Sequence, residues 1–262
     1  GRRGMSTVAG TAHLEVSGDT LVKHVACGSI TDGNHNRGDR SCVKHTVVTV
    51  KDDAKVAMVL GAGYDSYAAV TYASMEGPDS SVTVNIDGGT VGYVYGGGYR
   101  GSIGNESYPL DSVTVNITSG TVLGSVFGGG RGGADKPIHD TAEGLVVSSD
   151  QSGLSDSTGL SYVYADTVTV NVSGGHIKGH IFGGGESVPK LAGSLSDGRG
   201  YTAGPGSGVS DVAKVVADSI NLRVTGGKFD GHIFGAGKGI TVSGGKVVDG
   251  DGVVRLPSVI SI

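Results

Sequence analysis

The stretch that decides the fold is VTVNITSGTVLGSVFGGG, which occupies residues 113–130. Apolar and polar residues alternate from Val113 to Ile117, a Ser-Gly pair follows, a second apolar run ends at Phe127, and three glycines close the stretch. Side chains of a strand point alternately to opposite faces, so the alternation predicts two short strands joined at the Ser-Gly pair. The β-branched residues and the recurrent glycines disfavour a helix here.

The same pattern recurs along the chain and indicates a repeat protein. Aligned on the apolar residue before the turn, the copies contain Val16, Val50, Ile86, Ile117, Val172, Val224 and Val242. The first three intervals between copies are similar, the next two are much longer, and the last is short. In the first six copies a glycine-rich triplet begins at a nearly constant distance after the aligned residue. Because one coil cannot bury its own apolar row, we expect the coils to stack.

The two long intervals predict insertions near residues 134–161 and 186–211, whose Ser, Gly, Asp and Pro content is typical of loops. Apolar runs at 162–165 and 212–217 precede two of the main strands and are interpreted as a third strand of the coil. The predicted fold is all-β, a parallel β-solenoid of the right-handed β-helix type. We expect a single domain over residues 1–262 that is a segment of a longer protein.

The composition agrees with a thin core and excludes several classes of partner. Gly accounts for 50 of 262 residues and hydrophobic residues for 37%, which is too little for one thick globular core but enough for a thin core along an axis. The net charge of −5 argues against nucleic acid as the main partner. No run of about 18 apolar residues is present, so no membrane insertion is expected.

The repeated pattern of alternating Val or Ile, a small-residue turn and a terminal Gly-Gly-Gly resembles the glycine-rich repeats of large bacterial cell-surface proteins. Their solenoids are similar in kind to β-helical adhesins and autotransporter passenger domains. This resemblance implies an extracellular, cell-surface location and an adhesive or spacer role. It brings no active-site motif and does not specify a ligand.

Two cysteines, Cys27 and Cys42, flank a polar loop over residues 28–41. A disulfide between them would close a short loop and contribute about 3 kcal/mol in the chain-entropy model. An oxidising exterior would favour that bond. In the alternative interpretation, Cys27 is simply a small residue at the first position of a glycine-rich triplet.

The loop between the cysteines has two candidate binding functions. Its tripeptide Arg37-Gly38-Asp39 resembles integrin-binding loops and is a candidate recognition site. Oxygen-bearing side chains at near-alternate positions are also what a Ca²⁺ loop requires, which makes Ca²⁺ the one candidate cofactor. The candidate ligands are Asp32, Asn34, Asn36 and Asp39. The alternative is an ordinary solvated loop, since Arg37 replaces the usual glycine of such loops and no bidentate Glu follows.

Other residues provide weaker signals for chemistry. His180 and His232 fall at the same outward position of neighbouring copies, which we interpret as a side-chain ladder rather than a metal site. A polysaccharide-degrading enzyme on a β-helix would need clustered carboxylates on one face. Asp52, Asp53, Asp65, Glu106 and Asp111 are present, but no paired carboxylates recur at stacked positions, and no catalytic residue is assigned.

Three functions remain as hypotheses. The first is a non-catalytic extracellular solenoid that serves as an adhesive or structural stalk segment and binds a glycan or protein of a host or neighbouring cell. The second is a filament subunit that joins end to end with copies of itself, because open strand edges template further pairing. The third is a β-helix polysaccharide-degrading enzyme, supported only by analogy of fold.

Overall fold

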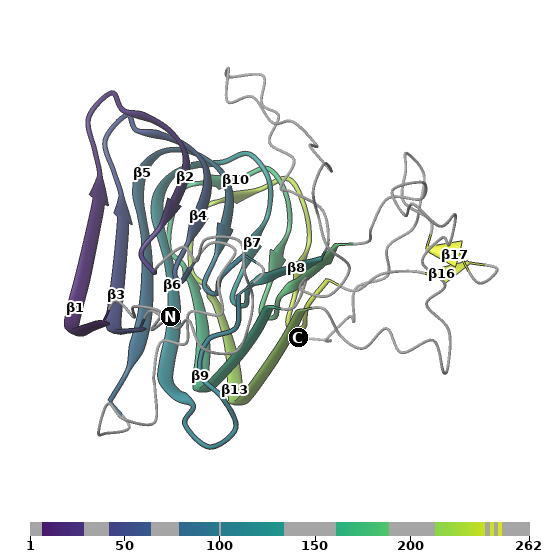
Figure 1. Cartoon of the computed structure of the whole chain (residues 1–262). Helices are drawn as coiled ribbons and strands as arrows, with labels where there is room; N and C mark the ends of the chain where they lie inside the picture. The colour runs from purple at the N-terminus through teal and green to yellow at the C-terminus, as the bar shows by residue number, and fades with distance from the viewer. Residues whose placement is uncertain are drawn as a thin grey trace, which may run out of the picture.

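The computed structural model describes residues 7–28, 42–63, 79–99, 101–133, 161–188, 213–238, 242–243 and 246–247. Within these ranges every regular element is a β-strand. Most strands belong to one 13-stranded sheet, accompanied by two sheets of two strands each. The main sheet is parallel and curls like half a barrel, and Figure 1 shows its successive layers side by side.

The long strands of the sheet come from successive sequence copies and pair with each other in parallel. They are β1 (Thr7–Val16), β3 (Cys42–Val50), β5 (Ser81–Tyr95), β6 (Leu110–Val122), β9 (Ser161–Val172) and β13 (Ala213–Val224). The residues placed side by side by this pairing are Val16, Val50, Ile86, Ile117, Val172 and Val224. The repeat alignment is therefore confirmed for its first six copies.

The seventh copy does not join this register. Val242 lies in β16 (Val242–Ser243), which pairs antiparallel with β17 (Lys246–Val247) in a separate two-stranded sheet. The expectation that Val242 continues the stack is therefore wrong. The interval from Val224 to Val242 is half of that from Val50 to Ile86, so it is too short for another full coil and the chain pairs locally instead.

A tight corner ends the first strand of each coil, and the chain there adopts a left-handed backbone. The corner residues with positive φ are Gly18, Asp52, Gly89, Gly120, Gly175 and Gly227. Glycine enters this region without steric penalty, and Asp is among the few other residues that do so with ease. The glycines of the turn are therefore explained by backbone conformation, as the alternating pattern predicted.

After the corner the chain returns across the core in a second row of short strands. This row contains β2 (Leu21–Ala26), β4 (Lys55–Leu60), the second half of β5, the end of β6, β7 (Val126–Phe127), β10 (His176–Ile177), β11 (Ile181–Phe182), β14 (Lys228–Phe229) and β15 (Ile233–Phe234). Each segment pairs in parallel with the equivalent segment of the next coil. Each coil therefore contributes two strands that face each other.

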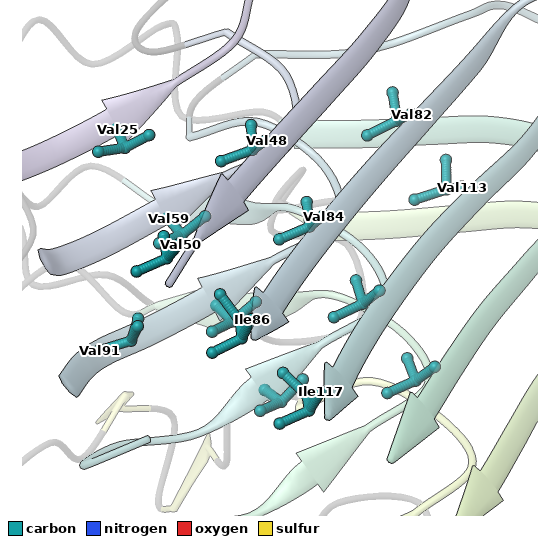
Figure 2. Packing of buried hydrophobic residues seen from close by; sticks show 14 of the residues in the cluster. Val25, Val48, Val50, Val59, Val82, Val84, Ile86, Val91, Val113 and Ile117 are labelled. Atoms are coloured by element: carbon teal, nitrogen blue, oxygen red, sulfur yellow. The ribbon is translucent and has the colours of Figure 1, made fainter. Parts of the chain in front are cut away.

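The core lies between the two rows of strands, and each row contributes one layer of side chains to it. Figure 2 shows Val48, Val84 and Ile86 of the first row meeting Val59 and Val91 of the second. All five are fully buried. Each coil thus covers the apolar row of the next, and the stack has a continuous core although each coil contributes few apolar residues.

The glycine triplets allow successive coils to approach closely. A Cβ added at Gly96 would lie 2.3 Å from the carbonyl oxygen of Gly128, and one added at Gly128 would lie 2.3 Å from that of Gly183. The same added atoms would meet the Val113 and Val168 side chains of the first row at 2.7 and 2.8 Å. A side chain at these positions would therefore collide with both a neighbouring coil and the core.

Two details differ from the sequence expectation. Residues 162–165 do not form a separate third strand, because they continue directly into β9 and pair in register with β13 from Ser161 onward. Instead, a short third segment follows the glycine triplets and forms β8 (Arg131–Gly133) and β12 (Glu186–Val188). The start of the expected 186–211 insertion is therefore strand, while residues 134–160 and 189–212 lie outside the described ranges.

Candidate functional site

Side chains on the outer face of the long strands form a hydrogen-bonded ladder across four coils. Asn116 donates to Asn85 and Asn171 donates to Asn116, both from Nδ2 to Oδ1 at 2.9 Å. Asn85 in turn donates to Thr49 Oγ1 at 3.4 Å. These four residues occupy one register position, so the ladder results from repetition of the sequence pattern.

Aromatic rings stack in a second ladder on the far side of the short strands. The rings of Tyr95, Phe127 and Phe182 are nearly parallel, with centroids 5.0 and 4.8 Å apart, and Phe234 continues the stack 5.0 Å beyond Phe182. Together with Met58 and other apolar residues these rings form a second buried cluster. The ladder places the hydroxyl group of Tyr95 toward the segment that follows the glycine triplets.

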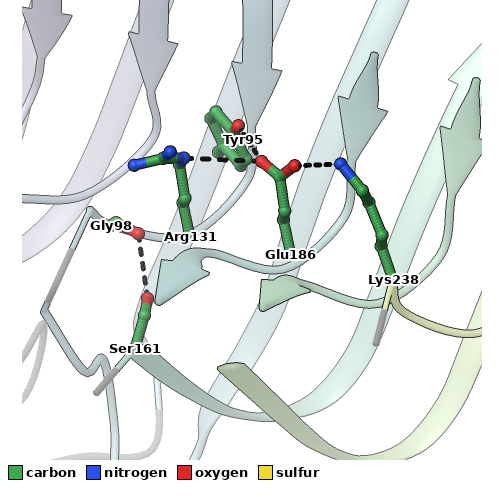
Figure 3. A network of polar contacts seen from close by, with 6 residues as sticks. All are labelled: Tyr95, Gly98, Arg131, Ser161, Glu186 and Lys238. Atoms are coloured by element: carbon green, nitrogen blue, oxygen red, sulfur yellow. Dashed lines mark hydrogen bonds and ion pairs between the residues drawn. The ribbon is translucent and has the colours of Figure 1, made fainter. Parts of the chain in front are cut away.

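A third ladder of side chains is both charged and buried, and it lies directly after the glycine triplets. The position after each triplet is occupied in turn by Tyr99, Arg131, Glu186 and Lys238, whose backbones pair across the coils. Figure 3 shows Glu186 between Arg131 and Lys238, with Tyr95 donating a hydrogen bond to the same carboxylate. We call Tyr95, Arg131, Glu186 and Lys238 the ion ladder.

Glu186 makes polar contacts through both of its carboxylate oxygens. Oε2 lies 3.5 Å from Arg131 Nε and accepts the Tyr95 hydroxyl, while Oε1 accepts a hydrogen bond from Lys238 Nζ. Side-chain exposure is only 7% for Glu186 and 8% for Arg131. The Arg131 guanidinium also lies 5.4 Å from the centroid of the Tyr99 ring, a cation–π distance.

The electrostatics of the ion ladder follow from burial and from these partners. Burial opposes ionisation of Glu186, but Lys238 and then Arg131 overcome it and lower the pKa of the carboxyl. Burial, reinforced by the neighbouring Glu186 charge, raises the pKa of Tyr95 well above its usual value. At neutral pH the ladder therefore holds an ionised Glu186 between two cations and a protonated Tyr95.

This arrangement fits a structural role better than a catalytic one. A general acid or base must reach a substrate, but both oxygens of Glu186 are engaged and the side chain is buried. Buried ion pairs contribute little net stability against an apolar equivalent, yet breaking one is costly. The ion ladder by itself is therefore weak evidence for stability, but loss of one partner would leave a buried charge unpaired.

Single carboxylates recur in register on the surface. Asp111, Asp166 and Asp218 occupy one position in β6, β9 and β13, directly before paired Ser and Thr residues. All three are exposed. Partial burial, followed by the charges of Asp79 and Asp166, raises the pKa of Asp111. The sequence shows these Asp-Ser and Asp-Thr pairs before the strand in several copies, where they indicate turns.

The described residues contain no group of three or more His, Cys, Asp or Glu side chains placed to hold a metal ion. His180 and His232 do lie together, with ring centroids 5.5 Å apart and ring planes within 10°. The His232 amide donates to His180 Nδ1 at 2.9 Å. The predicted histidine ladder is thus confirmed.

The candidate site residues of the first loop are only partly described. Cys27 is a buried free thiol in this structure, and its Sγ donates to the Ala12 carbonyl at 3.1 Å. Burial raises the pKa of this thiol. The side chain of Cys42 lies outside the described residues, as do Asp32, Asn34, Asn36, Arg37, Gly38 and Asp39. The disulfide, Ca²⁺ and recognition-loop assignments therefore stay predictions.

The ion ladder is the main feature that the sequence interpretation missed. Glu186 falls within a predicted loop, and the sequence assigns no role to Arg131 or Lys238. The available signal was position, because Tyr99, Arg131, Glu186 and Lys238 each follow a Gly-Gly-Gly or Gly-Ala-Gly triplet directly. Opposite charges at equivalent positions of stacked copies would have predicted ion pairs.

Comparison with known proteins provides no family for this chain. Searches against protein-family models, curated proteins and solved structures each found no match. In the part of the chain that the structure describes, no helix has the length and apolar character needed to cross a membrane.

Proposed function

We propose that this chain is a non-catalytic β-solenoid segment of an extracellular surface protein, coiled as a right-handed β-helix. The observation that supports the proposal best is the single register shared by six copies, from Val16 to Val224. A stack in which each coil contacts only its neighbours extends by adding coils, at about 4.8 Å each. Such a scaffold suits a stalk or an adhesive spacer.

In this proposal, recognition belongs to the interruptions of the stack rather than to its repeated faces. The inner rows are buried and the ion ladder is occupied by its own partners, whereas loops on a rigid scaffold usually provide binding residues. The candidate sites are the loop between Cys27 and Cys42, with or without Ca²⁺, and the parts of the two predicted insertions outside the strands, residues 134–160 and 189–211. The proposed ligand is a glycan or protein on a host or neighbouring cell.

The location is tested on intact cells that produce the parent protein. Trypsin applied from outside is expected to remove the segment from intact cells, as detected with an antibody raised against the purified chain. A cytoplasmic protein measured in parallel controls for cell lysis. If the segment is digested only after the cells are broken, the extracellular assignment is wrong.

The non-catalytic role is tested with the purified chain on a panel of polysaccharides and surface glycans. We expect binding without release of new reducing ends, and a reduced signal for the double variant R37A/D39A if the first loop is the site. Repeating the measurement with a calcium chelator tests the Ca²⁺ assignment. Release of reducing ends above a buffer control would contradict the proposal and support an enzyme.

A further inference from the structure

The two ends of the stack expose apolar residues that inner coils bury. In β13, the last long strand, Ile220 and Val224 are 38% and 37% exposed. Val168 and Val172, which pair with Ile220 and Val224, are 0% and 1% exposed. The residues are of the same kind and point to the same core, so the difference arises because β13 pairs with a described strand, β9, on one side only.

The opposite end of the stack has the same property. In the first coil Val8 is 40% exposed, whereas Val43, which pairs with it in β3, is 8% exposed. Both ends are parts of one parallel sheet, so β1 and β13 run in the same direction and present complementary unpaired edges. An unpaired strand edge with apolar residues is a template for pairing with another chain.

The outer polar ladder indicates which partner fits these edges. Its inner members are the neutral Thr49, Asn85, Asn116 and Asn171, but the same register position is Glu15 in β1 and Arg223 in β13. Opposite charges thus occupy this position at the two ends of the stack. Glu15 already forms an ion pair with Lys51 of the second coil, at 2.9 Å, on its inner side.

We infer that the β13 edge of one molecule docks in parallel on the β1 edge of a second copy, in the register of the repeats. That register places Arg223 of one copy beside Glu15 of the next, so Glu15 would lie between Arg223 and Lys51 of its own chain. Apolar residues also match, because Ile220 meets the small Ala12, Leu222 meets Leu14 and Val224 meets Val16. These pairs continue the inward rows observed inside the stack.

A second charge pair falls in the second row of strands. The register of that row aligns Val22 of β2 with Phe229 of β14, so the residues that follow them, Lys23 and Asp230, are at equivalent positions and have opposite charge. Asp230 already contacts His176 of the inner coil, with Nε2 to Oδ2 at 2.7 Å. Docking would therefore place Asp230 between His176 of its own chain and Lys23 of the next copy.

The association joins unlike surfaces, so it does not close on itself as a two-fold dimer would. Head-to-tail contacts without rotational closure generate open chains. The inference depends on the stacked coils of the proposed function, but it is independent of the extracellular and adhesive roles. Failure of the surface or glycan experiments would leave it intact, and its own failure would leave those roles intact.

Sedimentation velocity of the full chain over a concentration series tests the inference. We expect the unaltered chain to form dimers and longer species as concentration rises. Arg223→Glu should raise the concentration of half-association at least about tenfold, because like charges would face each other across the contact. Arg223→Lys keeps the charge and should associate nearly as the unaltered chain does.

A charge-reversal variant separates docking from folding. The double variant E15K/R223E restores opposite charges at the contact and should recover the association that Arg223→Glu alone removes. Far-ultraviolet circular dichroism verifies that each variant is folded. The inference is overturned if the unaltered chain stays monomeric throughout the series, as it would if residues 253–262 of the same chain cover β13. It is equally overturned if Arg223→Glu associates normally.

Discussion

Among single residues, the first triplet glycines Gly61, Gly96 and Gly128 are tightly constrained. Each would place an added Cβ close to a carbonyl oxygen of the next coil on one side and to a valine of the long strand on the other. The corner glycines have a different requirement, which is a left-handed backbone. The same residue type therefore serves two purposes within each coil, and the two can be distinguished by mutation.

Gly128→Ala is expected to destabilise the fold by about 1–3 kcal/mol, the usual cost of overpacking a tight interior. The added Cβ would meet the Gly183 carbonyl oxygen at 2.3 Å, and backbone atoms cannot move aside as a side chain can. Urea denaturation measures the effect. Gly10→Ala is the matched control, because nothing lies within 4 Å of a Cβ there. Equal stability of the two variants would contradict this explanation of the triplets.

Glu186 illustrates how a single buried charge depends on its neighbours. Glu186→Gln would leave Arg131 and Lys238 without their counter-charge and is expected to cost about 3–5 kcal/mol, the usual cost of breaking a buried ion pair. The control is Glu15→Gln, which removes an ion pair between exposed side chains, Lys51 at 40% and Glu15 at 54%, and should change stability far less. A Glu186→Gln loss no larger than that of the control would contradict a buried, paired carboxylate.

The same carboxylate predicts an acid-dependent loss of stability. The pKa of Glu186 in the folded protein lies below its ordinary value of 4.5. Its contribution is therefore fully present above pH 4.5 and is lost as pH falls through the folded pKa. Thermal unfolding measured from pH 6 to pH 3 should show a larger decrease of stability for the unaltered chain than for Glu186→Gln. Parallel curves would show that Glu186 is not ionised in the fold.

Among elements, the contact between the fifth and sixth coils includes the stacked histidines. Burial, then His232 and Lys238, lower the pKa of His180, so the folded state disfavours its protonation. Protonation at Nδ1 would also remove the acceptor of the His232 amide. A lowered folded pKa means that the stabilising contribution is present above the ordinary value of 6.5 and declines as pH falls through the folded pKa.

His180→Asn is expected to reduce this pH dependence, because Asn supplies an acceptor but does not titrate. Hydrogen exchange of the His232 amide, corrected for intrinsic rates, should show a loss of protection from pH 7.5 to pH 5.5 in the unaltered chain and a smaller one in the variant. His13→Asn in the first coil serves as control, since it leaves the fifth and sixth coils unchanged. If His13→Asn reduces the pH dependence of His232 amide exchange as much as His180→Asn does, the assignment of that dependence to His180 is wrong.

In the whole molecule, the stack distributes stability unevenly between its middle and its ends. Inner coils have a neighbour on both sides, whereas β1 and β13 have one and expose apolar residues. In repeat proteins stability is approximately a sum over coils and their interfaces, so the ends open first. Hydrogen exchange read by mass spectrometry should therefore show the slowest exchange in β5 and β6 and the fastest in β13 and β1.

That measurement is best made on Arg223→Glu at low concentration, where end-to-end contacts would not protect the edges. The same measurement on the unaltered chain at high concentration should slow exchange selectively in β1 and β13. Uniform protection across all strands would mean that the domain unfolds as one unit and would contradict the gradient.

The repeat register was predictable because it depends on local periodicity. Alternation with period two, a small-residue turn and a fixed distance to the glycine triplet together align Val16 through Val224, and strands with one buried face tolerate no slip by a single position. Two predictions from the sequence were wrong for the same reason: that Val242 continues the stack, and that the residues before Asp166 form a strand separate from β9. In both places the secondary structure depends on pairing with a neighbouring segment rather than on the local residues.

The contacts of the ion ladder and of the aspartate column were not predicted, although their residues recur at equivalent positions of the sequence copies. Arg131 and Glu186 are separated by an insertion, and nothing local indicates that the residue after a triplet turns inward to meet the Tyr95 hydroxyl. Burial of a charge depends on what covers it, which is a property of several coils at once.

Whether a feature can be predicted from the sequence therefore depends on how far apart in the sequence its interacting residues lie. Alternating Val and Ile residues, corner glycines and their spacing specify strands, turns and the order of stacking, because each depends on a few neighbouring residues. The pairing of Glu186 with two cations and the opposite charges of Glu15 and Arg223 at the two edges emerge only when the coils are stacked. Side chains that are far apart in the sequence, such as Arg131 and Glu186, then become neighbours across a single strand spacing.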